Sequence, residues 1–186
     1  MQVTANTALL LIDLQCGFDI PNYWGKQRNN PYAEQVCFEL LQFWRKQKLP
    51  IFHVQHTSND PQSPLHPSHA GFAFKTLTQP MPNEIVIQKS VNSAFIGTDL
   101  QQQLQQQAIT QLVIVGLTTD HCISTTTRMA GNLGYTVYVV ENATATFDRQ
   151  GLHGEHYSAQ QIHQIHLASL HNEFTQVIHS DEILKS

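Results

Sequence analysis

The sequence predicts an α/β protein with a three-layer αβα, Rossmann-like fold around a six-stranded, mostly parallel sheet. Short apolar runs rich in β-branched residues alternate along the chain with segments whose apolar residues recur at helical spacing. This alternation is typical of strands joined by helical crossovers that cover both faces of a parallel sheet. No repeat or linker interrupts the pattern, so we expect a single domain over residues 1–186.

Six segments are predicted to be strands. Most are continuous apolar runs next to turn residues, as expected where a strand is covered on both faces. In chain order they are 8–12, 51–54, 84–88, 112–115, 136–140 and 177–178. Between the second and third strands, residues 57–83 hold most of the prolines and show no periodic pattern, which is typical of a functional loop.

Local signals predict where the helices begin. Asn30 followed by Pro31 has the pattern of an N-cap and a first helical turn. Thr98 is expected to cap a short Gln-rich helix, and Cys122 is expected in the first turn of the helix that follows the fourth strand. Ser158 and Gln161 have capping-box spacing at the start of the last helix. One face of that helix is predicted to carry Ile162, Ile165 and Ser169.

Composition restricts the class of function. The net charge of −4 gives no electrostatic footprint for nucleic acid or anionic lipid. No apolar run approaches the ~20 residues that a membrane span requires, and no signal peptide is recognisable. Three widely spaced cysteines suit reduced thiols better than a disulfide framework. We therefore expect a cytoplasmic protein that acts on a small molecule, with neither nucleic acid nor membrane as a partner.

Three residues with useful chemistry stand at the carboxyl ends of predicted strands: Asp13, Lys89 and Cys122. Ligands of parallel α/β sheets bind beyond those ends, so the three are expected on one rim of the sheet. The N–H groups of a first helical turn stabilise a thiolate, which makes Cys122 a candidate nucleophile. His121 is discounted as its partner, because neighbouring residues on a helix point about 100° apart.

Proton transfer from Cys122 to Asp13 needs help from the surroundings. The ordinary pKa values of Asp and Cys are about 3.9 and 8.5, so they differ by ~4.6 units, or roughly 6 kcal/mol. Burial would raise the pKa of Asp13, while the helix N-terminus and Lys89 would lower that of Cys122. The three groups are then expected to titrate as one unit. Taken singly, each has an ordinary structural explanation: a capping Asp, a surface Lys and a packed Cys.

Histidine, with 11 residues, must be considered for metal binding. His53, His56, His66 and His69 form two H-x2-H pairs, but positions i and i+3 of a strand face opposite sides. We therefore expect no metal site. The later histidines are expected on the surface or on helix faces: His153, His156, His163, His166 and His171. Cys16 is expected to be a packed thiol.

The chain resembles the isochorismatase-like cysteine hydrolase superfamily. The matching motifs are Leu11-Ile12-Asp13-Leu14-Gln15, Lys89-Ser90-Val91-Asn92-Ser93-Ala94-Phe95 and Gly116-Leu117-Thr118-Thr119-Asp120-His121-Cys122. Two later segments, 129–135 and 142–148, also match. Together the motifs span most of the chain in the order found in the family.

The resemblance implies an Asp-Lys-Cys triad that hydrolyses small amides through an acyl-enzyme. Cys122 would be the nucleophile, Asp13 the acid and base, and Lys89 the residue that polarises both. A non-proline cis peptide is implied at Leu117–Thr118. The N–H groups of Thr118 and Cys122 would then form the oxyanion hole. No cofactor is implied.

The resemblance also restricts the expected class of substrate. A nucleophilic Cys122 favours an amide, lactam or ureido compound over isochorismate. His56 and Ser58 stand where nicotinamidases carry two metal ligands, so that metal site is expected to be absent. Substrate binding is expected from Gln15, Phe18, Trp24 and Phe95. A homodimer or homotetramer is expected. Two alternatives stay open: a metal-assisted, nicotinamidase-like amidase, and a catalytically idle member that binds a ligand or partner.

Overall fold

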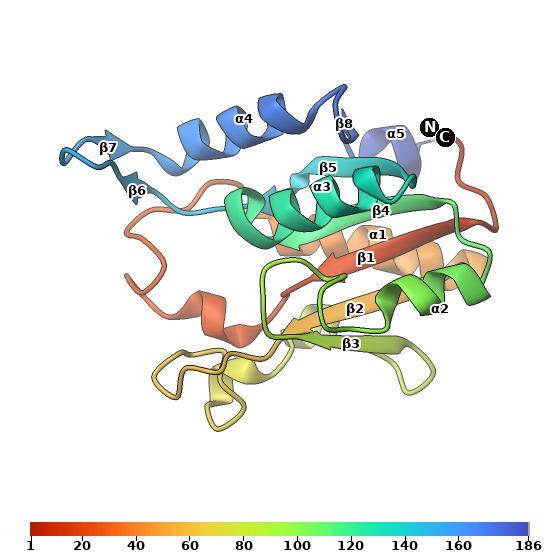
Figure 1. The fold of residues 1–186 in the computed structure, drawn as a ribbon, viewed down its shortest axis with the longest axis horizontal. Helices are drawn as coiled ribbons and strands as arrows, with labels where there is room; N and C mark the ends of the chain where they lie inside the picture. The colour runs from red at the N-terminus through yellow and green to blue at the C-terminus, as the bar shows by residue number, and fades with distance from the viewer. Residues whose placement is uncertain (186) are drawn as a thin grey trace.

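The structure is a computed structural model that describes residues 1–185, in which helices cover both faces of a six-stranded sheet (Figure 1). The strand order is β3-β2-β1-β4-β5-β8, and every neighbouring pair is parallel. The predicted three-layer α/β fold is therefore confirmed, with an entirely parallel sheet. The strands are β1 (Thr7–Ile12), β2 (Ile51–His56), β3 (Ile85–Lys89), β4 (Gln111–Leu117), β5 (Thr136–Ala145) and β8 (Gln176–Ile178).

Helices α1 and α5 pack on one face of the sheet, and α2, α3 and α4 pack on the other (Figure 1). Their bounds are α1 (Ala33–Gln47), α2 (Leu100–Gln106), α3 (Ser124–Asn132), α4 (Ala159–Leu170) and α5 (Asp181–Leu184). Shorter elements are η1 (Cys16–Asp19), η2 (Ala70–Phe72), η3 (Thr76–Thr78), a π-helical turn η4 (Thr119–Ile123), and a hairpin of β6 (Arg149–Gln150) and β7 (His156–Tyr157). No helix among the described residues is long and apolar enough to cross a bilayer.

Strand β1 shows why the apolar runs form this sheet. Leu9 and Leu11 pack in the core on the α1 side, whereas Leu10 and Ile12 pack in the core on the opposite side. Because successive side chains of a strand point to opposite faces, a strand covered on both faces is apolar at every position. The continuous run that predicted this strand is thus the direct consequence of its central place.

The topology places the ends of β1, β3 and β4 around one crevice. From β1 the chain winds outward through β2 to β3, then returns to β4 on the other side of β1. Such a reversal of strand order leaves a crevice at the carboxyl edge of the sheet. Asp13 directly follows β1, Lys89 is the last residue of β3, and Cys122 lies in η4 directly after β4.

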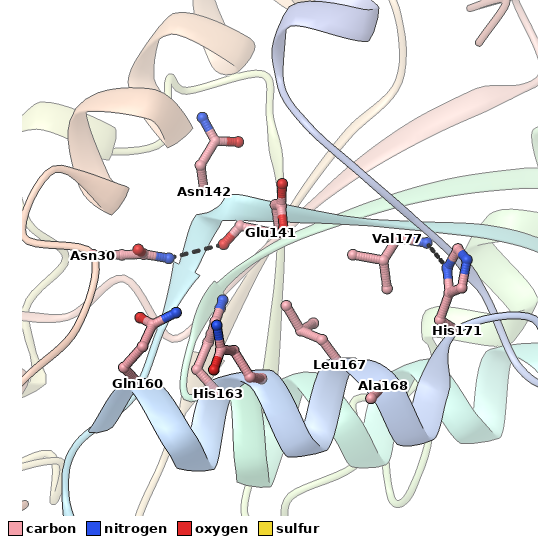
Figure 2. A pocket seen from close by; sticks show the side chains of 10 residues that line it. Asn30, Glu141, Asn142, Gln160, His163, Leu167, Ala168, His171 and Val177 are labelled. Atoms are coloured by element: carbon pink, nitrogen blue, oxygen red, sulfur yellow. Dashed lines mark hydrogen bonds between the residues drawn. The ribbon is translucent and has the colours of Figure 1, made fainter. Parts of the chain in front are cut away.

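The predicted cap at Asn30 is wrong, and the predicted cap at Thr98 is displaced by one residue. Helix α1 begins at Ala33 with Tyr32 at its N-cap, while the Asn30 side chain donates hydrogen bonds to the carbonyl oxygens of Glu141 (2.9 Å; Figure 2) and Thr144 (2.7 Å). Asn30 therefore ties its loop to β5, which extends to Ala145, beyond the predicted strand end at residue 140. At α2 the N-cap is Asp99, one residue after Thr98, but the Thr98 hydroxyl accepts from the N–H of Leu100 (3.3 Å) and donates to the carbonyl of Ala94 (2.6 Å).

Helix α4 begins with the predicted capping box at Ser158, but it buries a different face. Ile165 is 60% exposed, and the buried residues are Ala159, His163, Leu167 and Leu170. His163, which was predicted on the surface or a helix face, is buried because Thr119 of η4 supplies a hydrogen-bond partner for its Nδ1 at 2.9 Å. The hydrogen-bonded ring of His163 is therefore buried in the core, whereas Ile165 of the predicted apolar face is exposed.

Gly116 allows β4 to approach β1 just before the crevice. It pairs with Ile12 in the parallel register, at a place where the register of β4 with β5 shifts. Its φ of +118° lies in a region that favours glycine, and a Cβ added there would stand 2.0 Å from the carbonyl oxygen of Ile12. A side chain at position 116 is incompatible with this contact.

Glu84 joins the C-terminal part of α1 to the start of β3. Its carboxylate accepts hydrogen bonds from Arg45 Nε (2.7 Å), Arg45 Nη2 (2.8 Å) and His53 Nε2 (2.8 Å). Burial by itself would raise the pKa of Glu84, but Arg45, the N–H of Met81 and His53 outweigh it and lower the pKa to about 2. Glu84 is therefore ionised throughout the neutral range.

We expect Gly116→Ala to lower the free energy of unfolding by more than about 3 kcal/mol, because backbone must move to admit the methyl group. Gly134→Ala is the matched control: Gly134 also has positive φ (+89°), but nothing lies within 4 Å of an added Cβ. Its cost should be about 1 kcal/mol. Urea unfolding of the two variants measures the difference; equal losses would show that the contact with Ile12 does not matter.

We expect Glu84→Gln to destabilise the protein at pH 7, with a difference from wild type that narrows as the pH falls. The pKa of Glu84 lies below its ordinary value of 4.5, so its stabilising contribution is complete above pH 4.5 and is lost as the pH falls toward about 2. Urea midpoints at pH 7, 5 and 3 test this. Glu39→Gln, an exposed position of α1, controls for the loss of a negative charge. A difference that stays constant would contradict the assignment.

Candidate active site

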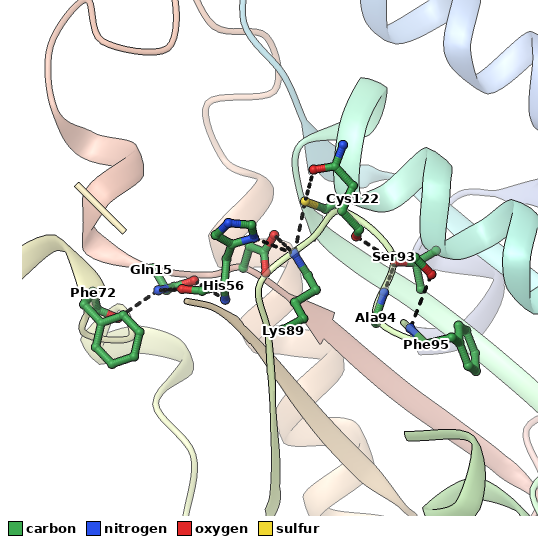
Figure 3. A network of polar contacts seen from close by, with 11 residues as sticks. Gln15, His56, Phe72, Lys89, Ser93, Ala94, Phe95 and Cys122 are labelled. Atoms are coloured by element: carbon green, nitrogen blue, oxygen red, sulfur yellow. Dashed lines mark hydrogen bonds and ion pairs between the residues drawn. The ribbon is translucent and has the colours of Figure 1, made fainter. Parts of the chain in front are cut away.

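The buried ammonium of Lys89 connects the three residues that the sequence placed on one rim. Its Nζ donates to Asp13 Oδ2 at 2.8 Å and to Cys122 Sγ at 3.2 Å (Figure 3). The side chains of Lys89 and Asp13 have no exposed surface, and Cys122 is 7% exposed. Three strand ends thus bring a nucleophile, a carboxylate and an ammonium into direct contact.

His56 belongs to the same cluster, which the sequence reasoning missed. It is the last residue of β2 and pairs with Lys89 in the parallel register, and its Nδ1 lies 3.0 Å from Lys89 Nζ (Figure 3). Burial first, and then Lys89, lower the pKa of His56, so its ring is neutral and Nδ1 accepts from the ammonium. The strand-end rule that identified Lys89 would have identified His56 as well.

The ionisation of Lys89 is fixed by its partners. Burial alone would lower the pKa of Lys89, but the charge of Asp13 and the hydrogen bonds to Asp13 and Cys122 outweigh this effect and raise it. An ammonium has three N–H donors, and here they meet one acceptor each on Asp13, His56 and Cys122. Lys89 is therefore a fixed positive charge rather than a proton carrier.

Cys122 is held as a thiol in the resting site. Burial raises its pKa, and the carboxylate of Asp13 raises it further, against the smaller lowering effect of Lys89. The sequence-based expectation of a lowered pKa was wrong, because it did not include the burial of the sulfur or the adjacent Asp13. The thiol also lies 3.7 Å from Oδ1 of Asn92, another contact that the sequence did not predict.

One carboxylate oxygen of Asp13 accepts no hydrogen bond from the described residues. Its Oδ1 is buried without a hydrogen-bond partner, while its Oδ2 accepts from Lys89. A buried carboxylate oxygen without a donor is costly and is typical of a functional group that exchanges protons. The backbone of Asp13 is also in the left-handed region, with φ of 53°, a conformation that is unfavourable for most residues.

The peptide bond between Leu117 and Thr118 is cis, as the family resemblance implied. Thr118 follows β4 directly, and its carbonyl accepts from the N–H groups of His121 and Ile123 in η4. Thr118 and Cys122, the two residues predicted for the oxyanion hole, both line the same cavity.

A cavity of about 240 Å³ lies over Cys122. Of the predicted substrate-binding residues, Phe18 and Trp24 line it, and their rings stack with centroids 4.6 Å apart. Tyr23 meets Trp24 edge-on at 4.8 Å, and we call Phe18, Tyr23 and Trp24 the aromatic wall. The other lining residues are Asp13, His56, Ser58, Asp60, Ser63, Leu65, Asn92, Thr118, His121 and Cys122.

Gln15 and Phe95, also predicted to bind substrate, are not among the residues that line this cavity. The amide of Gln15 is buried and holds the backbone: its Nε2 donates to the carbonyls of His56 (3.1 Å) and Phe72 (2.9 Å), and its Oε1 accepts from the N–H of His56 (2.8 Å). Phe95 stacks on Tyr135 with centroids 6.1 Å apart. Gln15 thus fixes the end of β2 beside the site.

Arg149 joins the turn that carries Cys122 to the aromatic wall. Its Nη2 and Nε bind Asp120 Oδ2 of η4 at 2.8 and 3.0 Å, and its Nη1 donates to the carbonyl of Trp24 at 2.7 Å. His121 lies at the rim of the cavity, where its ring is 57% exposed and approaches Asp120 at 3.6 Å. Arg149 therefore holds η4 and the wall in one arrangement.

The site does not fit a metal ion. Among the described residues, the group with convergent ligand atoms is Asp13, His56 and Cys122, whose atoms lie within 4.8 Å of one another. The ammonium of Lys89 already contacts all three, so a metal would have to replace a buried positive charge. The remaining candidate histidines bind elsewhere: His53 to Glu84, His66 to Ser68 and His69 to the carbonyl of Pro61.

A larger cavity of about 520 Å³ is lined by residues of α4, β5 and β8 (Figure 2). Its lining includes His163, Leu167 and His171 but none of Asp13, Lys89 or Cys122. The smaller cavity therefore remains the candidate active site, because Cys122 and Asp13 line it and neither lines the larger one.

Comparison with known proteins places this site in a family. The isochorismatase domain family matches residues 7–182. The uncharacterised isochorismatase family protein YrdC of Bacillus subtilis (strain 168) is 45% identical over 177 residues, which cover 95% of this chain and 94% of that protein. Streptothricin hydrolase of Streptomyces noursei is 26% identical over 141 residues, 76% of this chain and 55% of that protein.

A solved structure extends the comparison to three dimensions. The crystal structure of a hydrolase of the isochorismatase family from Chromobacterium violaceum ATCC 12472 matches with a TM-score of 0.94 and 43% identity. The match covers 99% of this chain and 94% of that chain. Sequence and fold agree over nearly the whole length, and the chain belongs to the isochorismatase family of hydrolases.

Proposed function

We propose that the protein hydrolyses the C–N bond of a small amide, lactam or ureido compound through a covalent acyl-enzyme on Cys122. The observation that carries the proposal is the buried contact of Lys89 Nζ with both Asp13 Oδ2 and Cys122 Sγ beneath a cavity. A nucleophile, a base and a fixed positive charge are the groups that acyl transfer needs. Streptothricin hydrolase, a relative, is named for a hydrolytic activity on a small molecule.

In the first step the substrate carbonyl lies over Cys122. The thiol proton passes to Oδ1 of Asp13, which has no other partner, as Sγ bonds to the carbonyl carbon. The carbonyl electron pair moves to oxygen, where the N–H groups of Thr118 and Cys122 would stabilise the negative charge. The Lys89 ammonium keeps its proton and offsets the charge on the reacting groups.

In the second step the protonated Asp13 gives its proton to the leaving nitrogen, and the C–N bond breaks to leave a thioester on Cys122. Asp13 then takes a proton from water, whose oxygen attacks the thioester carbon. The acid product leaves and the proton returns to the sulfur, so the site ends as it began. His56 assists by holding Lys89 in place through Nδ1.

Two other functions remain as contrasts. A metal-assisted amidase would require a cation where the Lys89 ammonium lies. A catalytically inactive member of the family that only binds a ligand would not need a buried Asp13 oxygen without a hydrogen-bond partner. Turnover that survives dialysis against a chelator argues against the first, and Cys122-dependent turnover argues against the second.

The proposal extends to the state of the protein in the cell. We propose one domain over residues 1–186, a homodimer or homotetramer, and a cytoplasmic location. The free thiols of Cys16, Cys37 and Cys122 support a reducing compartment. Light scattering after size-exclusion chromatography measures the number of subunits.

We expect Cys122→Ala, Asp13→Asn and Lys89→Met each to lower kcat by about 10³-fold or more, since members of a catalytic unit are not replaceable one at a time. Release of ammonia from a panel of amides, lactams and ureido compounds measures this. Cys16→Ala is the matched control and should leave turnover unchanged, because its thiol donates to the carbonyl of Phe74 and Cys16 is not among the residues that line the cavity. Circular dichroism checks that each variant is folded. Full turnover by Cys122→Ala would refute the nucleophile.

We expect iodoacetamide to alkylate Cys122 slowly at pH 7 and faster at high pH, because burial and Asp13 raise the pKa of the thiol. Asp13→Asn should shift this profile to lower pH, since the opposing carboxylate is gone while Lys89 remains. Lys89→Met should shift it to higher pH. Mass spectrometry of the labelled peptides between pH 6 and pH 10 measures the rates, and a wild-type rate already maximal at pH 7 would disprove the resting thiol.

A further inference from the structure

We propose that the cavity selects its substrate by charge, taking a small amide that is neutral or cationic and rejecting one that carries a carboxylate, with Asp60 as the selecting residue. This inference rests on the proposed function and adds the chemical class of the substrate. It comes from how the charges and aromatic rings are distributed around the cavity over Cys122.

The positive groups near the cavity are already paired. Lys89 uses its three N–H donors on Asp13, His56 and Cys122, so it has none left for a substrate carboxylate. Arg149, behind the aromatic wall, is likewise bound to Asp120 and to the carbonyl of Trp24. A carboxylate entering the cavity would lose its water without gaining a charged donor, which is unfavourable.

A negative group, in contrast, lines the cavity where the cavity is open to solvent, since Asp60 is exposed. Asp60 lines the cavity, and its Oδ1 accepts one hydrogen bond from the N–H of Gln62 at 2.9 Å. Within residues 1–185, its Oδ2 has no partner, so this oxygen can accept from a substrate ammonium. Because Lys89 forms an ion pair with Asp13, Asp60 is the acidic residue of the lining that has no cationic partner among the described residues.

The aromatic wall suits the same substrate. The faces of tryptophan and phenylalanine rings attract cations and stack on flat groups. Phe18 and Trp24 stack on one another beside Cys122 and offer such a surface. The cavity of about 240 Å³ is smaller than the pockets of ~300–1,000 Å³ that hold drug-sized ligands, so one ring and a short substituent are expected.

The test uses three amides of matched size. Benzamide is neutral, 4-(aminomethyl)benzamide is a cation and 4-carbamoylbenzoate is an anion. At pH 8, where ordinary imidazoles are neutral, we expect kcat/KM for the cation to exceed that for the anion by about tenfold or more, as for a charge pair at a partly exposed site. Release of ammonia measures each rate.

Substitutions at Asp60 test whether this residue causes the preference for the cationic amide. Asp60→Asn should lower kcat/KM for the cation by about tenfold and leave benzamide within about twofold, and Asp60→Lys should favour the anion. Asp181→Asn, an exposed position on α5, controls for net charge and should change none of the three. A wild-type preference for the anion, or an equal effect of Asp60→Asn on all three amides, overturns the inference while the proposed function stands.

Measuring how tightly each amide binds separates the proposal of charge selection from the proposal of hydrolysis. If none of the amides is turned over, the proposed hydrolysis fails for this class, but Cys122→Ala can still be titrated with each compound through quenching of tryptophan fluorescence, since Trp24 lines the cavity. Tighter binding of the cation, lost in the double variant with Asp60→Asn, supports charge selection. Tighter binding of the anion refutes it.

Discussion

The structure depends on one buried ammonium. Taking the charge of Lys89 out of water costs several kcal/mol unless every N–H finds an acceptor. Asp13, His56 and Cys122 supply those acceptors from the ends of β1 and β2 and from η4, so the cost is met only when three separate elements are in register. The cluster therefore fixes the geometry of the rim, and a shift of any one element would leave an N–H of Lys89 without its acceptor.

This arrangement also explains how a raised thiol pKa is compatible with nucleophilic chemistry. Burial and the nearby Asp13 keep Cys122 protonated, while the free oxygen of Asp13 is positioned to accept the proton when a carbonyl arrives. The positive charge of Lys89 does not move and reduces the cost of each charged intermediate. In such a coupled site no single pKa describes the reactivity, since the proton belongs to the group as a whole.

Around the cluster, polar side chains keep loops in position. Gln15 binds both backbone groups of His56, and Arg149 binds Asp120 and the carbonyl of Trp24. These contacts link the sheet, the catalytic turn and the aromatic wall, which are far apart in the sequence. A cavity with one carboxylate at its edge and aromatic rings on its wall is thus held on a rigid base.

The strands, their parallel arrangement and the common rim of Asp13, Lys89 and Cys122 could be predicted from the sequence, because apolar periodicity and strand ends are local properties of the chain. The neighbours that complete the site could not be predicted in this way, because they depend on how the elements pack. The contacts of His56 and Arg149, the burial of His163 and the protonation of the thiol arise between residues distant in sequence. Such contacts and the loss of water around them depend on how elements pack, which no local pattern encodes.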